Sequence, residues 1–167
     1  MNANYLDSVI KQFEYYKLLA EKTFAQLPDE KLIWQYNEDS NSVAIIVKHL
    51  SGNMLSRWTD FLTTDGEKAW RNRDTEFEND ISVKQEMLDR WTEGWKVFLD
   101  ALRHLKGEDL EKIIYIRNEG HTVLEAINRQ LAHYSYHIGQ IVFIGKLCAN
   151  KWESLSIPKG NSKHFNA

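Results

Sequence analysis

The sequence has little cysteine, since Cys148 is the only one among its 167 residues. A lone cysteine excludes an intramolecular disulfide bond. The chain starts with MNANYLDSVIKQFEYY, which lacks the uninterrupted apolar stretch of a signal peptide. We therefore expect a cytoplasmic protein.

Long apolar runs and an excess of basic residues are also missing. The most apolar stretch, residues 138–147, is interrupted by Gln140 and Lys146 and is far shorter than the ~20 residues that span a bilayer. The formal net charge is -3 at pH 7, so the chain has no basic excess with which to neutralise phosphates. We expect neither a membrane nor a nucleic acid as partner. The sequence also lacks a glycine-rich phosphate loop, an internal repeat and a separable linker.

Apolar residues, by contrast, are plentiful at 43% of the chain, and most of them recur at helical spacing. This length and composition predict one globular domain, residues 1–167, with a polar C-terminal tail from about residue 150. Trp152, Leu155 and Ile157 could dock the tail across the bundle, and His164 falls in an end that we expect to be mobile. The predicted fold class is all-α, a four-helix bundle.

A first helix is predicted by apolar residues at three- and four-residue spacing from Leu6 onward, and Pro28 ends it. Ser42 is the expected N-cap of a second helix over residues 42–64. The residues between these helices show no sustained period and predict an ordered connection. Within it, Trp34 either plugs one end of the core or faces a pocket. We expect the plug, because large aromatic side chains usually serve burial.

The third helix is predicted to start at a capping-box pattern, which Ser82 and Gln85 form. Its apolar stripe continues to Leu105, and Gly107 is expected to end it. His104, near this end, is interpreted as a favourable charge at a helix C-terminus or an ordinary surface residue.

A short β-branched and aromatic segment, IIYI at residues 113–116, follows the third helix. It is too short to found a sheet, so we expect an extended connection or a small hairpin. Thr122 and Glu125 form a second capping-box pattern, which predicts the start of the last helix. His121 is then interpreted as a residue at the start of that helix rather than a ligand.

The last predicted helix carries His133 and His137, four residues apart. Side chains at this spacing project from one face with Cβ atoms about 5–6 Å apart, so two imidazoles can bind one metal ion without bending the backbone. Both histidines border the apolar stripe of their helix, and His49 holds the same place beside the stripe of the second helix. If these helices pack side by side, the three histidines predict one metal site.

Other interpretations of the histidines stay open at this point. Six histidines in 167 residues produce about 0.2 pairs at this spacing by chance. Two histidines hydrogen-bonded at the edge of the core would show the same pattern. The stretch HYSYH also lacks the glutamate of HExxH, which disfavours peptide hydrolysis. If a metal binds, each imidazole needs a partner for its second nitrogen, and helical phase favours Asn53, Gln130 and Gln140.

A charged connection at residues 65–81 is longer than the usual two to eight residues between helices. Its Arg71 and Arg73, together with Arg57 of the preceding helix, could bind an anionic substrate or cofactor, because guanidinium groups bind carboxylates in a bidentate manner. The alternative, which surface charges adopt more often, is a solvated loop in which these arginines pair with acidic neighbours. Those neighbours are Asp74, Glu76 and Glu78.

Five stretches carry a resemblance: VKHLSGNMLSRWTDF, DGEKAWRNRDTEF, EGHTVLEA, LAHYSYHIGQI and WESLSIPKG. Together they resemble the DinB/YfiT-like superfamily of metalloenzymes, and the resemblance spans nearly the whole chain. The resemblance implies a DinB-like four-helix bundle of up-down-down-up type. It also implies that His49, His133 and His137 bind nickel or zinc. Some relatives transfer low-molecular-weight thiols such as bacillithiol or mycothiol to electrophiles.

Three neutral imidazoles leave a bound ion its charge and an open position for water or a substrate thiolate. We therefore expect a divalent-metal-dependent enzyme acting on a small electrophilic substrate, as a thiol S-transferase or a hydrolase. The alternative is a non-catalytic metal-binding or interaction bundle.

The last helix also has a second apolar face, outside its main stripe, formed by Ala132, Tyr136 and Phe143. Such a face needs cover from the monomer itself, from a pocket wall or from a second copy. Because the family resemblance implies frequent dimers, we expect a homodimer.

Overall fold

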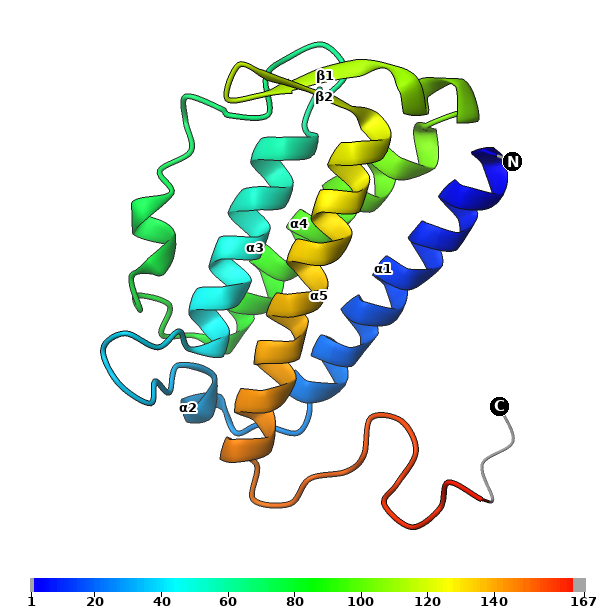
Figure 1. The fold of residues 1–167 in the computed structure, drawn as a ribbon. Coiled ribbons are helices and arrows are strands. Elements are labelled where there is room, and N and C mark those ends of the chain that lie inside the picture. Colours follow the sequence, from blue (N-terminus) through cyan, green and yellow to red (C-terminus); the bar gives the residue numbers. More distant parts are fainter. Residues whose placement is uncertain (1, 164–167) are drawn as a thin grey trace.

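The computed structural model describes residues 2–163, so His164 lies outside the described residues. The helices are α1 (Asn2–Phe24), α2 (Asp29–Leu32), α3 (Val43–Trp58), α4 (Lys84–His104) and α5 (Val123–Cys148). Two 3-10 helices, η1 (Asp74–Phe77) and η2 (Gly107–Glu111), lie between them, as does an antiparallel hairpin of β1 (Ile113–Ile116) and β2 (Glu119–Thr122). The four long helices form a bundle, which confirms the all-α prediction (Figure 1).

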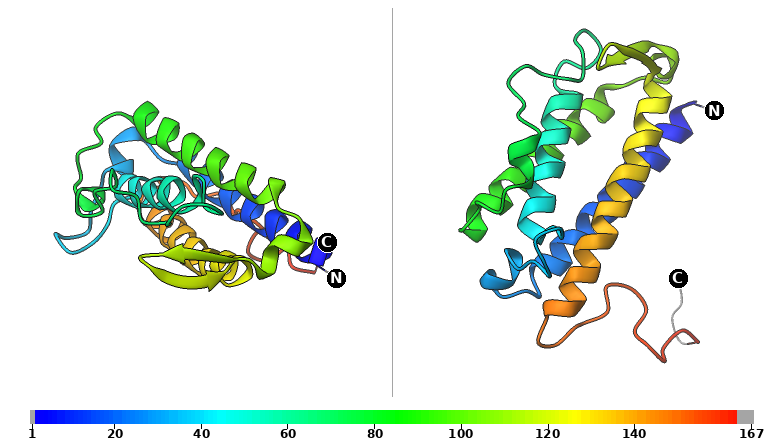
Figure 2. Two further views of the ribbon diagram at one scale, coloured as in Figure 1. Left: turned by 90° about the horizontal axis from the view of Figure 1, so that it is seen from above. Right: turned by 60° about the vertical axis from the view of Figure 1, so that its left-hand side comes forward.

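The long helices run in two directions: α1 and α5 descend in Figure 1, whereas α3 and α4 rise. The most extensive packing is between α3 and α4, and next between α1 and α5. The hairpin crosses one end of the bundle and α2 lies at the other (Figure 2). Within the described residues, no helix is long and apolar enough to cross a membrane.

The parallel course of α3 and α4 explains the long charged connection that the sequence contains. A chain that leaves one end of a helix must return along its length before it can start a parallel neighbour. The connection makes this return outside α3 (Figure 1), and η1 packs against α3 on the way. This packing brings acidic and basic side chains of the connection to the histidine face of α3.

An aromatic cluster fills the centre of the bundle. Its members are fully buried and come from α1, α4 and α5: Phe13, Trp95, Phe98 and Tyr134. Their rings meet edge to face, with centroids 4.6 Å apart for Phe13 and Phe98 and 5.1 Å apart for Phe98 and Tyr134. Burial of such a side chain stabilises a fold by roughly 1.5–3 kcal/mol. The cluster is therefore a main source of stability.

Two predicted helix boundaries at the charged connection were wrong. α3 ends at Trp58 rather than at Thr64, because Asp60 adopts a left-handed φ of 50° and its carbonyl accepts the backbone N–H of Thr63 and of Thr64. The predicted capping box at Ser82 is also absent, since α4 starts at Lys84 and Val83 is its N-cap. Gln85 donates to Asp89 instead of reaching back to the cap.

Two further expectations need correction. α4 ends at His104, and Gly107 begins η2 instead of ending α4, because Leu105 is already extended. Trp34 does not plug the core: it is half-buried and lines a pocket beside α5. The buried side chain of the unpredicted helix α2 is Leu32, which packs into the core in its place.

The predicted caps and the hairpin are present elsewhere. The hydroxyl of Ser42 accepts the backbone N–H of Ile45 at 3.1 Å. Thr122 and Glu125 form the reciprocal capping box that starts α5. The hairpin is the expected small one, and His121 lies on β2 opposite Ile114 rather than in the first turn of α5. The tail docks at the end of the bundle, where the backbone N–H of Glu153 donates to Gln26 at 2.7 Å and Trp152 lies beside Gly145.

Candidate metal centre

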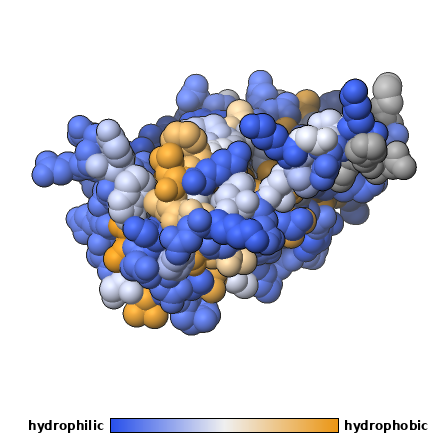
Figure 3. Space-filling view, turned by 90° about the horizontal axis from the view of Figure 1, so that it is seen from below, coloured by the Kyte–Doolittle hydropathy of each residue, from blue (hydrophilic) through white to orange (hydrophobic). Residues whose placement is uncertain are grey.

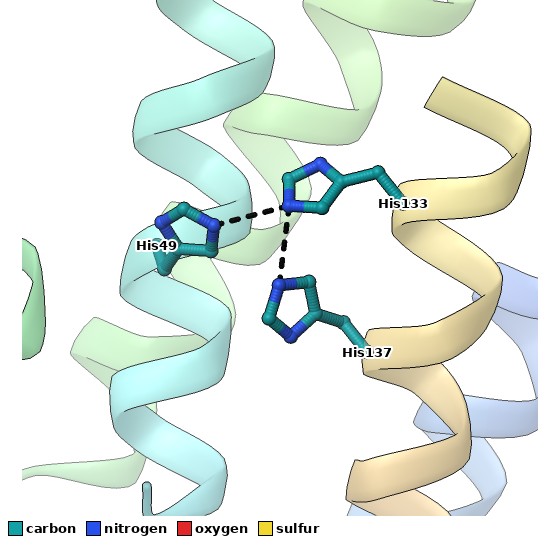
Figure 4. Close-up of side chains that lie close together, drawn as sticks. All are labelled: His49, His133 and His137. Carbon is teal, nitrogen blue, oxygen red and sulfur yellow. Dashed lines mark hydrogen bonds between the residues drawn. The ribbon is translucent and has the colours of Figure 1, made fainter. Parts of the chain in front are cut away.

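The three predicted ligands come together between α3 and α5. His49 projects from α3, and His133 and His137 project from successive turns of α5 toward it (Figure 4). The Nε2 atom of His133 lies 3.2 Å from Nε2 of His49 and 3.1 Å from Nε2 of His137. One ring nitrogen from each residue falls within 4.8 Å of the others, so the three histidines could hold a metal ion.

Each imidazole also has an oxygen partner at its second nitrogen, Nδ1. His49 Nδ1 lies 2.9 Å from a carboxylate oxygen of Glu76, and His137 Nδ1 lies 2.9 Å from the amide oxygen of Gln140. His133 Nδ1 has a longer contact of 3.4 Å with Gln130. The predicted contact of Gln130 and of Gln140 with a histidine ring is thus confirmed. That of Asn53 was wrong, because its amide oxygen accepts the hydroxyl of the buried Tyr134 instead.

These partners decide where the protons lie. An ionised carboxylate can only accept, so His49 must donate from Nδ1 to Glu76 and, when neutral, has a lone pair at Nε2. The amide oxygen of Gln140 has the same effect on His137. The Nε2 lone pairs of His49 and His137 therefore both point toward His133, an arrangement that a cation would relieve. Three imidazole nitrogens suit several divalent ions, including zinc and nickel, so the residues fit a metal without selecting which one.

Burial keeps two of the rings neutral. It lowers the pKa of His133 to about 3, helped by the neighbouring His137 and His49. It likewise lowers the pKa of His137 to about 4. A metal ion needs deprotonated imidazole nitrogens, so at neutral pH these side chains are in the form that binds.

Glu76 is itself held in place. Arg71 donates to both of its oxygens, from Nε at 2.7 Å and from Nη2 at 2.9 Å. Burial raises the pKa of Glu76, but the hydrogen bonds from His49 and Arg71 outweigh it, and the net pKa lies below its ordinary value. A Cβ atom on Gly52 would lie 2.2 Å from Oε1 of Glu76. Glycine at this position of α3 leaves room for the carboxylate where it lies beside His49.

The arginines predicted to bind an anion all line the same pocket as the histidines, but two of them have other partners. Arg71 pairs with Glu76, as the alternative interpretation expected, but the pair is buried and not solvated. Arg57 is buried and donates to the carbonyl of Gly66 and to Glu67. Arg73 is exposed and lies over the ring of Phe77, 4.9 Å from its centroid.

The histidine pocket has a volume of about 420 Å³ and a largely polar lining. Two of its arginines, Arg117 and Arg129, were missed from the sequence, as was the contact of Glu76 with His49. Arg129 had a usable signal, because it lies four residues before His133 and so on the same face of α5. No sequence signal pointed to Arg117 or to Glu76 as neighbours of the histidines, since neither lies in a segment with a helical period.

A second, more apolar pocket of about 510 Å³ adjoins the first. Asn41 lines both, and Gln140, the partner of His137, lines the second. Trp34 and Phe143 supply much of its apolar wall. It lies toward the end of the bundle that Figure 3 views from below, where apolar patches stand among hydrophilic side chains. The histidine cluster thus lines a cationic pocket and lies beside an apolar one.

Comparison with known proteins adds a family. Residues 1–161 match the family described as "Protein of unknown function (DUF1572)". A search of curated proteins returned no match to the sequence. The match spans nearly the whole chain and includes all three histidines, and the protein therefore belongs to the DUF1572 family.

Proposed function

We propose that the protein is a divalent-metal-dependent enzyme of the DinB-like superfamily that transfers a low-molecular-weight thiol, of the bacillithiol type, to a small electrophilic substrate. One observation carries the proposal: three imidazole Nε2 atoms from two helices face one another beside an open pocket. The resemblance of the histidine stretches to DinB/YfiT-like metalloenzymes supports the same conclusion.

A nickel or zinc ion held by His49, His133 and His137 would supply a Lewis acid that favours the deprotonated form of a thiol. The chain's own residues prepare the site for it. Glu76 keeps a proton on Nδ1 of His49, and Arg71 keeps Glu76 ionised and oriented. Gln140 fixes the ring of His137 in the same way. Outer partners of this kind orient ligands and raise their basicity.

The nucleophile in this proposal is the substrate thiol rather than a residue of the chain. Burial raises the pKa of the Cys148 thiol, which makes it a weak nucleophile at neutral pH. Cys148 is also the last residue of α5, about 11 residues beyond His137 along the helix. The single free cysteine suits a reducing compartment, and we place the activity in the cytoplasm on this ground.

Two other functions use the same residues. A hydrolase would use water bound to the ion as its nucleophile, and no Asp or Glu is among the described residues that line the pocket and could assist that water as a general base, since Glu76 is already bound by Arg71 and His49. A non-catalytic metal-binding bundle would need no open pocket beside its ligands, and a structural ion commonly has a fourth protein ligand. Thiol transfer is therefore the function that the site supports best.

Metal analysis of protein purified without an affinity tag, followed by a thiol-conjugation assay, tests the proposal. The parent should bind one divalent ion per chain and accelerate conjugation of bacillithiol to a generic electrophile. His137→Ala should lose both properties and keep the parent's circular dichroism. His104→Ala is the matched control, because that exposed histidine contacts only the carbonyl of Asp100 among the described residues.

Three outcomes would separate the alternatives. Full metal content in His137→Ala would overturn the metal site. A metal-loaded parent that hydrolyses an ester but conjugates no thiol would replace transfer by hydrolysis. A metal-loaded parent with neither activity would favour the non-catalytic bundle.

A further inference from the structure

Arginine is concentrated around the histidines to an unusual degree. Five of the seven arginines in the sequence line the histidine pocket: Arg57, Arg71, Arg73, Arg117 and Arg129. Among the described residues, none of the lysines and no Asp or Glu lines it, although lysine is the commoner basic residue here. A general excess of positive charge does not explain this, because the whole chain has a net charge of -3. The pocket is selectively built of guanidinium groups.

The five arginines fall into an inner and an outer set. Arg57 and Arg71 form the inner set, with side chains only 7% and 3% exposed, and each donates to a carboxylate. Their partners, Glu67 and Glu76, neutralise them. Buried guanidinium groups need such partners, so the inner set serves the structure of the site.

Arg73, Arg117 and Arg129 form the outer set, at the rim of the pocket. They come from three separate segments: the residue before η1, the turn of the hairpin, and α5. Within the described residues, neither Arg73 nor Arg129 has a carboxylate partner, and Arg117 shares Glu67 with Arg57 at 2.9 Å. Five guanidinium groups thus share two carboxylate partners, Glu67 and Glu76, which leaves an excess of positive charge among the side chains that line this pocket.

The hairpin turn that carries Arg117 is held in place by Asp65. Arg117 and Asn118 have left-handed φ values of 56° and 61°. The carboxylate of Asp65 accepts their backbone N–H groups at 2.9 and 2.8 Å. The N–H of Gly66 donates to the carbonyl of Tyr115 at 2.8 Å, which ties the charged connection to β1. Arg117 is therefore fixed beside the pocket by specific contacts and is not a freely moving surface residue.

We propose that Arg73, Arg117 and Arg129 bind the anionic group of the substrate, a carboxylate or a phosphate, at the rim of the histidine pocket. The proposal deepens the proposed function by naming the chemical class of the small molecule. Guanidinium groups bind both anions in a bidentate manner, which lysine cannot do, and this accounts for the selection of arginine. A pocket of about 420 Å³ has room for a small anionic molecule whose other end lies beside the histidines.

The direct test is isothermal titration of the parent, metal-free and metal-loaded, with succinate, with inorganic phosphate and with the neutral diamide succinamide. Both anions should bind and succinamide should not, and the tighter of the two anions identifies the preferred group. Arg73→Gln and Arg129→Gln should each weaken binding about tenfold, as loss of a hydrogen bond to a charged group predicts. Arg103→Gln is the matched control, because Arg103 is exposed, pairs with Glu14 and lies outside the pocket.

Equal binding of the anions by the parent, Arg73→Gln and Arg129→Gln would overturn the proposal, as would equal binding of succinamide. So would binding that requires the metal and is unaffected by the arginine variants, since the anion would then be a ligand of the ion. Metal content measured on the same samples separates this result from the proposed function. If the parent binds the anions but takes up no metal ion when metal is supplied, the enzyme proposal is overturned and the anion subsite stands.

Discussion

Two neighbouring residues of α5 face different regions of the molecule, the histidine centre and the aromatic core. His133 faces the pocket, whereas the next residue, Tyr134, is fully buried and contacts Phe13 and Phe98. Successive residues of a helix point about 100° apart, so one turn of α5 serves both regions. The hydroxyl of Tyr134 donates to Asn53, which lines the pocket, and this contact joins the two regions.

The two regions depend on different forces. The core is apolar and close-packed, and its contribution is non-directional burial. The centre contains buried polar groups, each of which must have a hydrogen-bond partner. Glu76 illustrates the second kind, because it is 5% exposed and contacts both His49 and Arg71. Stability should therefore respond to changes in the core, and metal binding to changes in the centre.

Phe98→Ala should have the largest effect on stability. Phe98 is fully buried and contacts four aromatic rings, so its loss should lower the free energy of unfolding by about 3–5 kcal/mol. Chemical denaturation measures this, and metal content of the folded variant should stay at the parent's level. Leu18→Ala, at a position of α1 that is 45% exposed, is the control and should change stability by less than about 0.5 kcal/mol. A loss below about 1 kcal/mol for Phe98→Ala would show that this cluster is not the main source of stability.

Glu76→Gln should weaken metal binding more than it lowers stability, the converse of Phe98→Ala. Removing the charge weakens the hold of Glu76 on His49 and its pair with Arg71, so metal affinity should fall about 10- to 100-fold. Competition with a chromogenic chelator measures the affinity. Glu86→Gln is the control, because Glu86 pairs with Arg90 on the exposed face of α4.

Gly52→Ala sharpens this result without removing a charge. Its Cβ would displace Oε1 of Glu76, so metal affinity should fall in the same direction as in Glu76→Gln. Parental affinity in both variants would mean that Glu76 does not position His49.

The exposed apolar residues of α5 form a third region, which adjoins the centre because Tyr136 lines the histidine pocket and its ring lies beside that of His137. Tyr136 and Phe143 are 54% and 63% exposed. The predicted homodimer would bury them, and light scattering at micromolar protein should then report twice the chain mass. Phe143→Ser should weaken the dimer about tenfold, since burial of a Phe is worth at least about 1.5 kcal/mol. Leu18→Ser, at an exposed position of α1, should not. A monomeric mass for the parent would contradict the prediction.

Asp65→Asn should have the smallest effect on the free energy of unfolding, and this effect should depend on pH. The backbone N–H groups of Glu67, Asn118 and Arg117 lower the pKa of Asp65. A carboxyl whose pKa is lower in the folded state stabilises the fold above its unfolded pKa, and this stabilisation is lost as pH falls through the folded pKa. The variant should be less stable than the parent at pH 7 by under about 1 kcal/mol, because the group is partly exposed. The difference in free energy of unfolding should be smaller at pH 2 than at pH 7. An equal difference at both pH values would rule out the charge of Asp65 as its cause.

Local spacing in the sequence predicted the four long helices and the ligand candidates. Stripes at three- and four-residue intervals predicted the bundle, and Thr122 with Glu125 predicted the start of α5. His133 and His137 share a helical face wherever α5 packs. A local rule failed at the predicted cap Ser82, where another local contact replaced it: Gln85 pairs with Asp89 one turn further along α4, and the helix starts at Lys84.

The surroundings of the ligands, by contrast, depend on contacts between segments that are distant in the sequence. Glu76 is separated from His49 by 27 residues of chain, and Arg117 lies in the turn of a hairpin. No period in the sequence relates these residues to the histidines. They meet because α3 and α4 are parallel, which makes the connection return along α3, and because Asp65 binds that connection to the hairpin turn. Helical spacing is a property of neighbouring residues, whereas the proton positions and the charge of this pocket depend on packing between distant segments.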